Sequence, residues 1–237
     1  LRIFSCELVI GILITMEVLL FLFVFFLGAS VGSFVNVLID RLPRRQDFVL
    51  ARSICESCKK KLSPWELVPI VSYLILRAKC RKCKKKIPAR IFAVEAICGL
   101  SYSIILSLHF FGVIEFVNAL YLLVMLPIFI GIIFTDFEFG IIPDEFILSL
   151  VGISSVYLVF FQYTAIVNHL ISGIGILLGF LMIFVATSGR GMGFGDVKLS
   201  FALGLFLGFP YVLISLYLAF LTGATVAIIL VLWGKKK

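Results

Sequence analysis

Four cysteines form the clearest pattern in the sequence that could support chemistry. Cys55 and Cys58 are separated by two residues, as are Cys80 and Cys83, and residues 59–79 lie between the pairs. Two Cys-x2-Cys pairs about twenty residues apart are typical of zinc sites, because each pair brings two sulfur ligands to one tetrahedral ion. All four ligand positions are then filled, so we expect a structural zinc ion. Disulfides and a redox pair are the alternatives; a reducing cytosol disfavours the first, and the second requires only one Cys-x2-Cys pair.

A second pattern consists of acids at the ends of apolar segments. Asp136 ends one such segment and Asp196 begins another. Ionisable groups at membrane depth are energetically unfavourable, so those that occur there indicate function. Two carboxylates that converge can share one proton, which gives one base to activate water and one acid to protonate a leaving amine. The pair therefore predicts aspartic-protease chemistry, with a helix N-cap as the alternative role of Asp196.

Three glycines at alternate positions precede Asp196. They are Gly191, Gly193 and Gly195, and Lys198 follows two residues after the acid. Glycine permits backbone dihedrals that other residues disfavour, and it allows a second chain to approach closely. We therefore expect these glycines and Lys198 to form a substrate-binding loop. The alternative is that the glycines only form the turn before a helix.

The remaining polar residues in apolar segments give weaker signals. Glu95 lies early in one such segment, where we expect it to pair with Arg90 or Lys198 or to line a polar cavity. Cys6 and Cys98 lie in apolar runs and are predicted to be packing residues.

The composition of the chain indicates which elements must position these residues. Of the 237 residues, 62% are hydrophobic and 14% are charged, whereas soluble domains average about 45–50% and about 25%. The sequence therefore predicts an all-α polytopic membrane protein with about seven transmembrane helices and a small zinc-binding cytoplasmic loop domain, at about 20 residues per crossing. The predicted spans are 18–39, 91–111, 117–135, 146–161, 166–187, 197–208 and 210–233. The last two are separated only by Phe209, so they are either a tight hairpin or one bent element.

The basic residues predict which loops face the cytoplasm. Residues 40–90 hold 15 of the 21 Lys and Arg residues and four of the 13 acids, and such loops face the cytoplasm and anionic lipid. Alternation then places 136–145, 188–196 and Lys235–Lys237 on the same side, so Asp136 and Asp196 share one membrane face. A basic segment between apolar helices is better explained by a bilayer with anionic headgroups as partner than by nucleic acid, so we expect no nucleic-acid binding.

Taken in order along the chain, these motifs resemble the type IV prepilin peptidases of bacteria, a family that combines a leader peptidase with an N-methyltransferase. The residues that carry the resemblance are 32–43, 65–73, Leu76 and Arg77, the two Cys-x2-Cys pairs, Asp136 with 143–144, and 191–198. This ordered set is more specific than the Gly-x-Gly-Asp element alone, which also occurs in presenilin-like intramembrane proteases.

The resemblance implies an enzyme of the bacterial cytoplasmic (inner) membrane. It implies an aspartic endopeptidase that removes the short basic leader of prepilins or pilin-like proteins at the cytoplasmic face, with Asp136 and Asp196 as the catalytic pair. It also implies N-methylation of the new N-terminus with S-adenosylmethionine, an activity associated with the zinc-bearing loop. The corresponding domains are a transmembrane segment at 1–39, the basic zinc-binding loop and methyltransferase part at 40–90, and the membrane protease domain at 91–237.

The sequence departs from the family pattern at two places. Ala78 stands where the family often has a glycine, and a position that needs glycine's backbone freedom would disfavour alanine, so methylation is expected to be weakened. The family commonly continues into an eighth span, whereas this sequence stops at Lys237; near the other end, Met16 is a candidate start. Two other functions remain open, a transport or binding protein and a catalytically inactive scaffold for pilus assembly.

Overall fold

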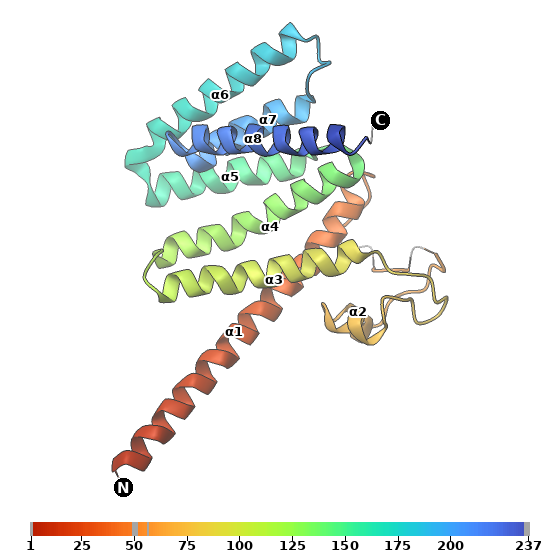
Figure 1. Cartoon of the computed structure of the whole chain (residues 1–237), viewed down its shortest axis with the longest axis vertical. Helices are drawn as coiled ribbons and strands as arrows, with labels where there is room; N and C mark the ends of the chain where they lie inside the picture. The colour runs from red at the N-terminus through yellow and green to blue at the C-terminus, as the bar shows by residue number, and fades with distance from the viewer. Residues whose placement is uncertain (1, 49–51, 56, 235–237) are drawn as a thin grey trace. The chain divides into compact units, whose positions relative to one another are not determined.

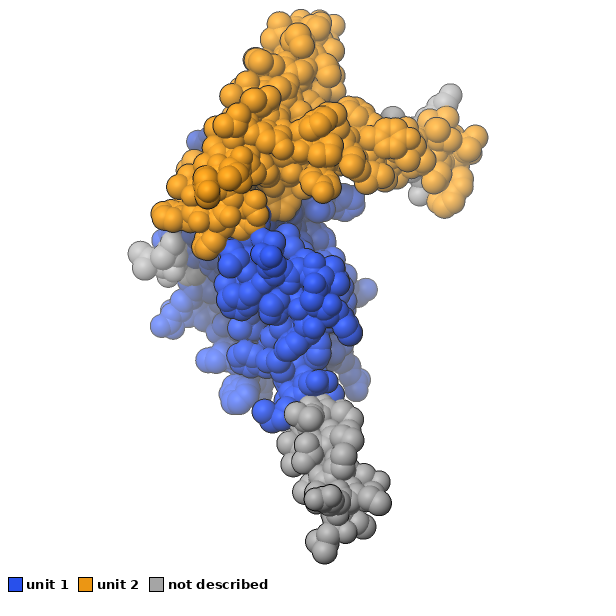
Figure 2. Space-filling model, turned by 90° about the vertical axis from the view of Figure 1, so that its left-hand side faces the viewer, with its two compact units in different colours: residues 1–143 blue, residues 144–237 orange. Residues whose placement is uncertain are grey.

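A computed structural model describes residues 2–48, 52–55 and 57–234 (Figure 1). The described part of the chain contains eight α-helices and two short 3-10 helices and no β-strand. The chain divides into two compact units, Leu1–Pro143 and Asp144–Lys237 (Figure 2). The predictions for Cys6 and for Lys235–Lys237 fall outside the side chains and residues that the structure describes.

Unit 1 consists of three long helices and an intervening loop. The helices are α1 (Arg2–Arg41), α3 (Ala89–Phe110) and α4 (Phe116–Phe139), and α1 packs against both of the others. The loop between α1 and α3 contains η1 (Pro64–Leu67) and α2 (Val71–Ile75). Unit 1 therefore holds the whole zinc-binding loop together with α4, whose last turn contains Asp136.

Small residues bring α1 and α3 into close contact. A methyl group added at Gly28 would lie 2.7 Å from the carbonyl oxygen of Cys98, and one at Gly32 would lie 2.9 Å from Cα of Glu95. The spacing Gly28-x3-Gly32 places both glycines on one face of α1, which is the pattern of closely packed membrane helices. Cys98 is fully buried in this contact, as its apolar surroundings predict.

Unit 2 consists of the remaining helices. They are α5 (Asp144–Phe161), η2 (Tyr163–Ala165), α6 (Ile166–Ala186), α7 (Phe194–Leu207) and α8 (Tyr211–Leu232). The short helix α7 packs against both α5 and α6. It approaches α6 so closely that a methyl group on Gly204 would overlap the backbone of Gly173. Unit 2 thus surrounds the helix that carries Asp196.

The all-α class predicted from the sequence is confirmed. Six stretches of the described helices are long and apolar enough to cross a membrane: Thr15–Arg41, Ala89–Phe110, Phe116–Phe139, Asp144–Phe161, Tyr163–Ala186 and Tyr211–Ile229. The sixth predicted span, 197–208, corresponds to α7, which has 14 residues and falls short of the about 20 residues that a perpendicular crossing needs. α7 and α8 are two separate helices rather than one bent element, because α7 ends before Gly208, whose φ is +65°.

Candidate metal centre and active-site acids

The two Cys-x2-Cys pairs fold into nearly identical turns. In each, the first cysteine accepts a hydrogen bond from the backbone N–H four residues later and donates one to the carbonyl five residues later, at 2.9–3.0 Å. The fourth residue after each first cysteine is a lysine with positive φ, 54° at Lys59 and 59° at Lys84. An isolated antiparallel bridge closes each turn, Ile54 with Lys61 and Lys79 with Lys86. Each pair of thiols is therefore positioned by local backbone hydrogen bonds.

The four thiols converge on one point. Their sulfur atoms all lie within 4.8 Å of one another, with 3.9 Å between Cys55 and Cys83 and 4.0 Å between Cys58 and Cys80. A tetrahedral ion with bonds of about 2.3 Å requires sulfur separations of about 3.8 Å. These distances are too long for a disulfide, whose sulfur atoms lie about 2.05 Å apart. The donor set and its dimensions therefore fit one zinc-type ion with no open position.

Three of the thiols have shifted pKa values, because backbone N–H groups, burial and the neighbouring thiols affect them to different extents. Hydrogen bonds from the Cys83 and Lys82 backbones lower the pKa of Cys80 to about 6, and the Cys58 backbone N–H lowers the pKa of Cys55. Although the Lys85 backbone favours the Cys83 thiolate, burial and the three neighbouring thiols together raise the pKa of Cys83 to about 11. Four thiolates at this spacing therefore need a bound cation to offset their mutual repulsion.

The loop is held against the first turns of α3. Glu95, which is buried, accepts a hydrogen bond of 2.6 Å from the backbone N–H of Ile70, and Tyr73 stacks on Phe92 with 5.3 Å between ring centroids. Ile70 has a φ of +64°, an unusual value for a β-branched residue. The prediction that Glu95 pairs with Arg90 is wrong, because Glu95 bonds the backbone of the loop and Arg90 contacts two other acids. A pairing of Glu95 with Lys198, which belongs to the other unit, stays a prediction.

Arg90 instead joins the ends of two other helices. Its guanidinium lies 2.7 Å from Asp40 at the end of α1 and 3.2 Å from Glu138 at the end of α4, and its side chain is only 9% exposed. Sequence reasoning missed this cluster. The signal that could have found it is that all three charges lie at ends of spans, where alternation brings them to one membrane face.

Asp136 lies in the last turn of α4. Its side chain is exposed, and its backbone carbonyl accepts a hydrogen bond of 2.8 Å from Gly140, whose φ of +64° ends the helix. The preceding Thr135 is fully buried and bonds the carbonyl of Gly131 at 2.6 Å. The helix end is thus fixed by its backbone, which leaves the carboxylate of Asp136 available for chemistry.

Asp196 lies in the first turn of α7, where its carboxylate accepts a hydrogen bond of 3.2 Å from the backbone N–H of Gly193. It thus caps the helix from inside its first turn, while Gly193 is the N-cap residue. None of the three motif glycines has the positive φ that favours glycine; in this loop the positive φ values are at Ser188, +50°, and Gly189, +73°. Asp136 and Asp196 lie in different compact units, so their convergence stays a prediction.

Lys198 contacts an acid rather than standing free. Its ammonium group lies 2.7 and 3.0 Å from the two carboxylate oxygens of Asp144 and 5.2 Å from the centre of the Phe194 ring. Asp144 begins α5, so this ion pair joins the starts of α5 and α7. Both residues line a cavity of about 370 Å³ with Glu145, Ile147, Leu148 and Val151. The predicted role of Lys198 in substrate binding is not tested by these contacts.

Two family models match the chain, and together they cover most of it. The bacterial peptidase A24 N-terminal domain matches residues 26–110, which include all four metal-site cysteines. The type IV leader peptidase family matches residues 123–228, which include both Asp136 and Asp196. The chain belongs to the type IV leader peptidase family. The resemblance drawn from the sequence motifs is therefore confirmed.

Curated relatives in this peptidase family align with the chain over most of its length. A prepilin leader peptidase/N-methyltransferase of Bacillus subtilis is 29% identical over 224 residues, which are 89% of this chain and 83% of the relative. Proteins of the same description from Neisseria gonorrhoeae and Pseudomonas aeruginosa are 27% and 28% identical, over 86% of this chain and 80% and 78% of the relatives. No solved structure matches the chain.

Proposed function

We propose that this protein is an aspartic endopeptidase of the bacterial cytoplasmic membrane that removes the leader peptides of prepilins or pilin-like proteins. Asp136 and Asp196 are its catalytic pair, and Gly191, Gly193, Gly195 and Lys198 form the loop that contacts the substrate. The observation that carries the proposal is the match to the leader peptidase family over residues 123–228, within which both acids lie at ends of helices.

The proposed sidedness follows from counting the spans. If the basic loop after α1 faces the cytoplasm, then α4 returns to that face at Asp136, and α6 returns to it before Asp196. A prepilin is itself anchored by an apolar helix, so a cleavage site at headgroup depth can reach acids placed there. The proposed partners are a prepilin or pilin-like protein and a bilayer with anionic headgroups; nucleic acid is not among them.

The chemistry needs one proton shared between the two carboxyl groups. The ionised carboxylate removes a proton from water as its oxygen attacks the scissile carbonyl, and the protonated carboxyl stabilises the developing oxyanion. Collapse of the tetrahedral intermediate then expels the amine of the mature N-terminus, which takes a proton from one of the acids. The hydrogen bond from Gly193 holds the carboxylate of Asp196 in a fixed orientation for these steps.

The loop has a separate proposed role. Cys55, Cys58, Cys80 and Cys83 hold a structural zinc ion, which stabilises the loop rather than taking part in cleavage. The relatives are named as N-methyltransferases, and we propose that residues 40–90 support transfer of a methyl group from S-adenosylmethionine to the new N-terminal amine. Residues 1–39 and 91–237 then form the transmembrane segment and the protease domain, a functional division distinct from the packing units.

Mass spectrometry of a model prepilin incubated with the purified full chain and S-adenosylmethionine tests both activities. The wild-type protein is expected to remove the leader and add one methyl group to the product. Asp136→Asn and Asp196→Asn are expected to leave the prepilin intact. Glu115→Gln is the matched control, because this exposed acid stands at the opposite end of α4, and it should cleave normally.

The other outcomes separate the competing functions. Cleavage that survives in both aspartate variants would disprove the catalytic pair. A wild-type protein that binds the prepilin without cleaving it would support the scaffold function instead. Cleavage without methylation would restrict the proposal to the peptidase.

A further inference from the structure

The α2 segment of the loop lies beside the first turns of α3. The Ile70 backbone bonds Glu95, which stands six residues after the start of α3 at Ala89. At 1.5 Å per residue this contact is about 9 Å along the span. The stacking of Tyr73 on Phe92 holds α2 beside the same turns (Figure 1). The loop segment around α2 therefore reaches the headgroup region rather than projecting wholly into water.

Apolar side chains are exposed on η1 and α2, which pack together. Trp65 is 83% exposed, Ile75 is 75% exposed and Leu74 is 60% exposed. Large exposed apolar residues in a basic loop are unfavourable in water but favourable at the boundary between headgroups and acyl chains. These exposed side chains belong to the same segment as Ile70 and Tyr73, which contact the first turns of α3, so they are suited to contact lipid.

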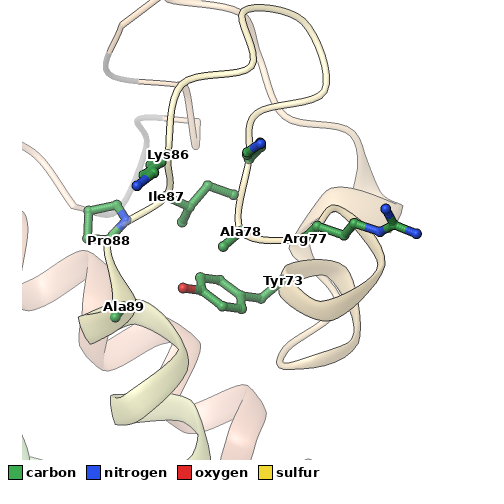
Figure 3. Close-up of a pocket in the computed structure, with 8 residues that line it drawn as sticks. Tyr73, Arg77, Ala78, Lys86, Ile87, Pro88 and Ala89 are labelled. Carbon is green, nitrogen blue, oxygen red and sulfur yellow. The ribbon is translucent and has the colours of Figure 1, made fainter.

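A cavity of about 510 Å³ opens next to this apolar surface. Figure 3 shows Tyr73 lying across from Ile87 and Pro88, which form its apolar part. Arg77, Lys79 and Lys86 line the same cavity, and among the described residues no acid lines it or forms an ion pair with any of the three. The cavity thus combines an apolar wall with basic side chains, of which Arg77 points away from Tyr73 and Ile87 in Figure 3.

The two lysines are brought together by the backbone. Lys79 and Lys86 are paired in the antiparallel bridge that closes the second cysteine turn, so their side chains leave the same face. Like charges placed directly opposite each other are destabilising. The first cysteine turn has the same bridge but pairs Lys61 with Ile54, so the fold itself does not require two cations there.

We propose that this cavity binds the phosphate headgroup of an anionic phospholipid. The phosphate lies between the ammonium groups of Lys79 and Lys86, and the glycerol and upper acyl chains lie against Tyr73, Ile87 and Pro88. A lipid fits better than free phosphate because most of the lining residues are apolar and the cavity adjoins both a span and exposed apolar side chains. The bound lipid would fix the zinc loop on the membrane surface.

Native mass spectrometry of the zinc-loaded full chain tests the lipid site without any prepilin. Phosphatidylglycerol and phosphatidylcholine are titrated in turn, and the retained lipid is counted. Lys79→Gln/Lys86→Gln is compared with the matched double variant Lys61→Gln/Lys82→Gln, which removes the same charge from the same loop. The first variant is expected to weaken retention of phosphatidylglycerol about tenfold or more, with a clearly smaller loss in the control and unchanged zinc content in both.

Three results would overturn the proposal. Equal losses in the two double variants would show diffuse attraction of lipid to a basic loop. Retention of phosphatidylcholine as strong as that of phosphatidylglycerol would show that the phosphate charge is not recognised. Displacement of the lipid by inorganic phosphate or by S-adenosylmethionine at comparable concentration would assign the cavity to a soluble ligand. Because no cleavage is measured, these results do not depend on the peptidase proposal.

Discussion

The cysteine loop and the pair of acids are both assembled from residues far apart in the sequence, but they are built in different ways. The four sulfur ligands lie within one compact unit, and each pair is set by hydrogen bonds among neighbouring residues. Asp136 and Asp196 each end or begin a helix, and they belong to different units. From this comparison we expect the cysteines to serve the fold and the acids to serve chemistry, so that removal of the acid charges leaves the local structure nearly intact.

Removal of the acid charges should separate these roles most clearly. Asp136→Asn and Asp196→Asn are each expected to slow leader cleavage by at least about 100-fold, because general acid–base catalysis requires the ionisable group. The thermal stability of the full chain should barely change, since Asn at 196 can still accept the hydrogen bond from Gly193. A large loss of stability in these variants would mean that the acids are structural. The cleavage rate and the thermal denaturation of each variant are measured in the same detergent.

Loss of one cysteine pair should give the opposite result. Cys80→Ser/Cys83→Ser is expected to reduce bound zinc from about one ion per chain to almost none, because a structural zinc ion needs four ligands and the variant keeps only two. The loop should become sensitive to protease, while cleavage of a prepilin falls less than in the aspartate variants. Cys98→Ser is the control, because this buried cysteine lies outside the cluster. Full zinc content in the double variant would refute the four-sulfur site.

Two ion pairs provide a test of how strongly each unit depends on charges at its helix ends. Arg90 is 9% exposed and contacts two acids, so Arg90→Ala should destabilise the chain by about 3 kcal/mol. Lys198 is 38% exposed and its partner Asp144 is 72% exposed, so Lys198→Ala should cost at most about 1 kcal/mol. Chemical denaturation of the two variants provides the comparison. Equal effects would show that burial does not control the strength of these pairs.

Ala78 tests the backbone of the loop. Its φ is +57°, a left-handed conformation that glycine adopts more readily than alanine. Ala78→Gly should therefore relieve strain worth about 1 kcal/mol, reduced by the greater freedom of glycine in the unfolded chain. Ala93→Gly, inside α3, should instead destabilise the chain. If methylation is limited by this position, Ala78→Gly should raise the yield of methylated product without changing cleavage.

The smallest expected effect concerns Glu66. Hydrogen bonds from Ser63 and Lys60 lower its pKa from 4.5 to about 2. A carboxylate with a lowered pKa stabilises the folded loop above the unfolded pKa, and the stabilisation is lost as pH falls through the folded value. The stability difference between wild type and Glu66→Gln should therefore be constant above about pH 5 and shrink as pH falls from 4.5 towards about 2. A stability difference that stays constant down to pH 2 would contradict the lowered pKa of Glu66. Limited proteolysis of the loop, with wild type and variant at each pH, measures this difference.

The sequence by itself determined those features that depend on local spacing and on overall composition. The apolar segments predicted an all-α membrane protein, because helices satisfy backbone hydrogen bonds within lipid. The Cys-x2-Cys spacing predicted a four-sulfur cluster, because each pair forms within one turn. The ordered motifs predicted the peptidase family, which the family models confirm.

Tertiary structure decided which charges meet. Arg90 pairs with Asp40 and Glu138 rather than with Glu95, because α1 and α4 end at the level where α3 begins. Glu95 bonds the loop instead, and Lys79 lies opposite Lys86 across a backbone bridge. The sequence shows which residues are charged, but their partners depend on the helix lengths, on the register between packed helices and on where the loop folds back. Those quantities are set by packing over the whole unit.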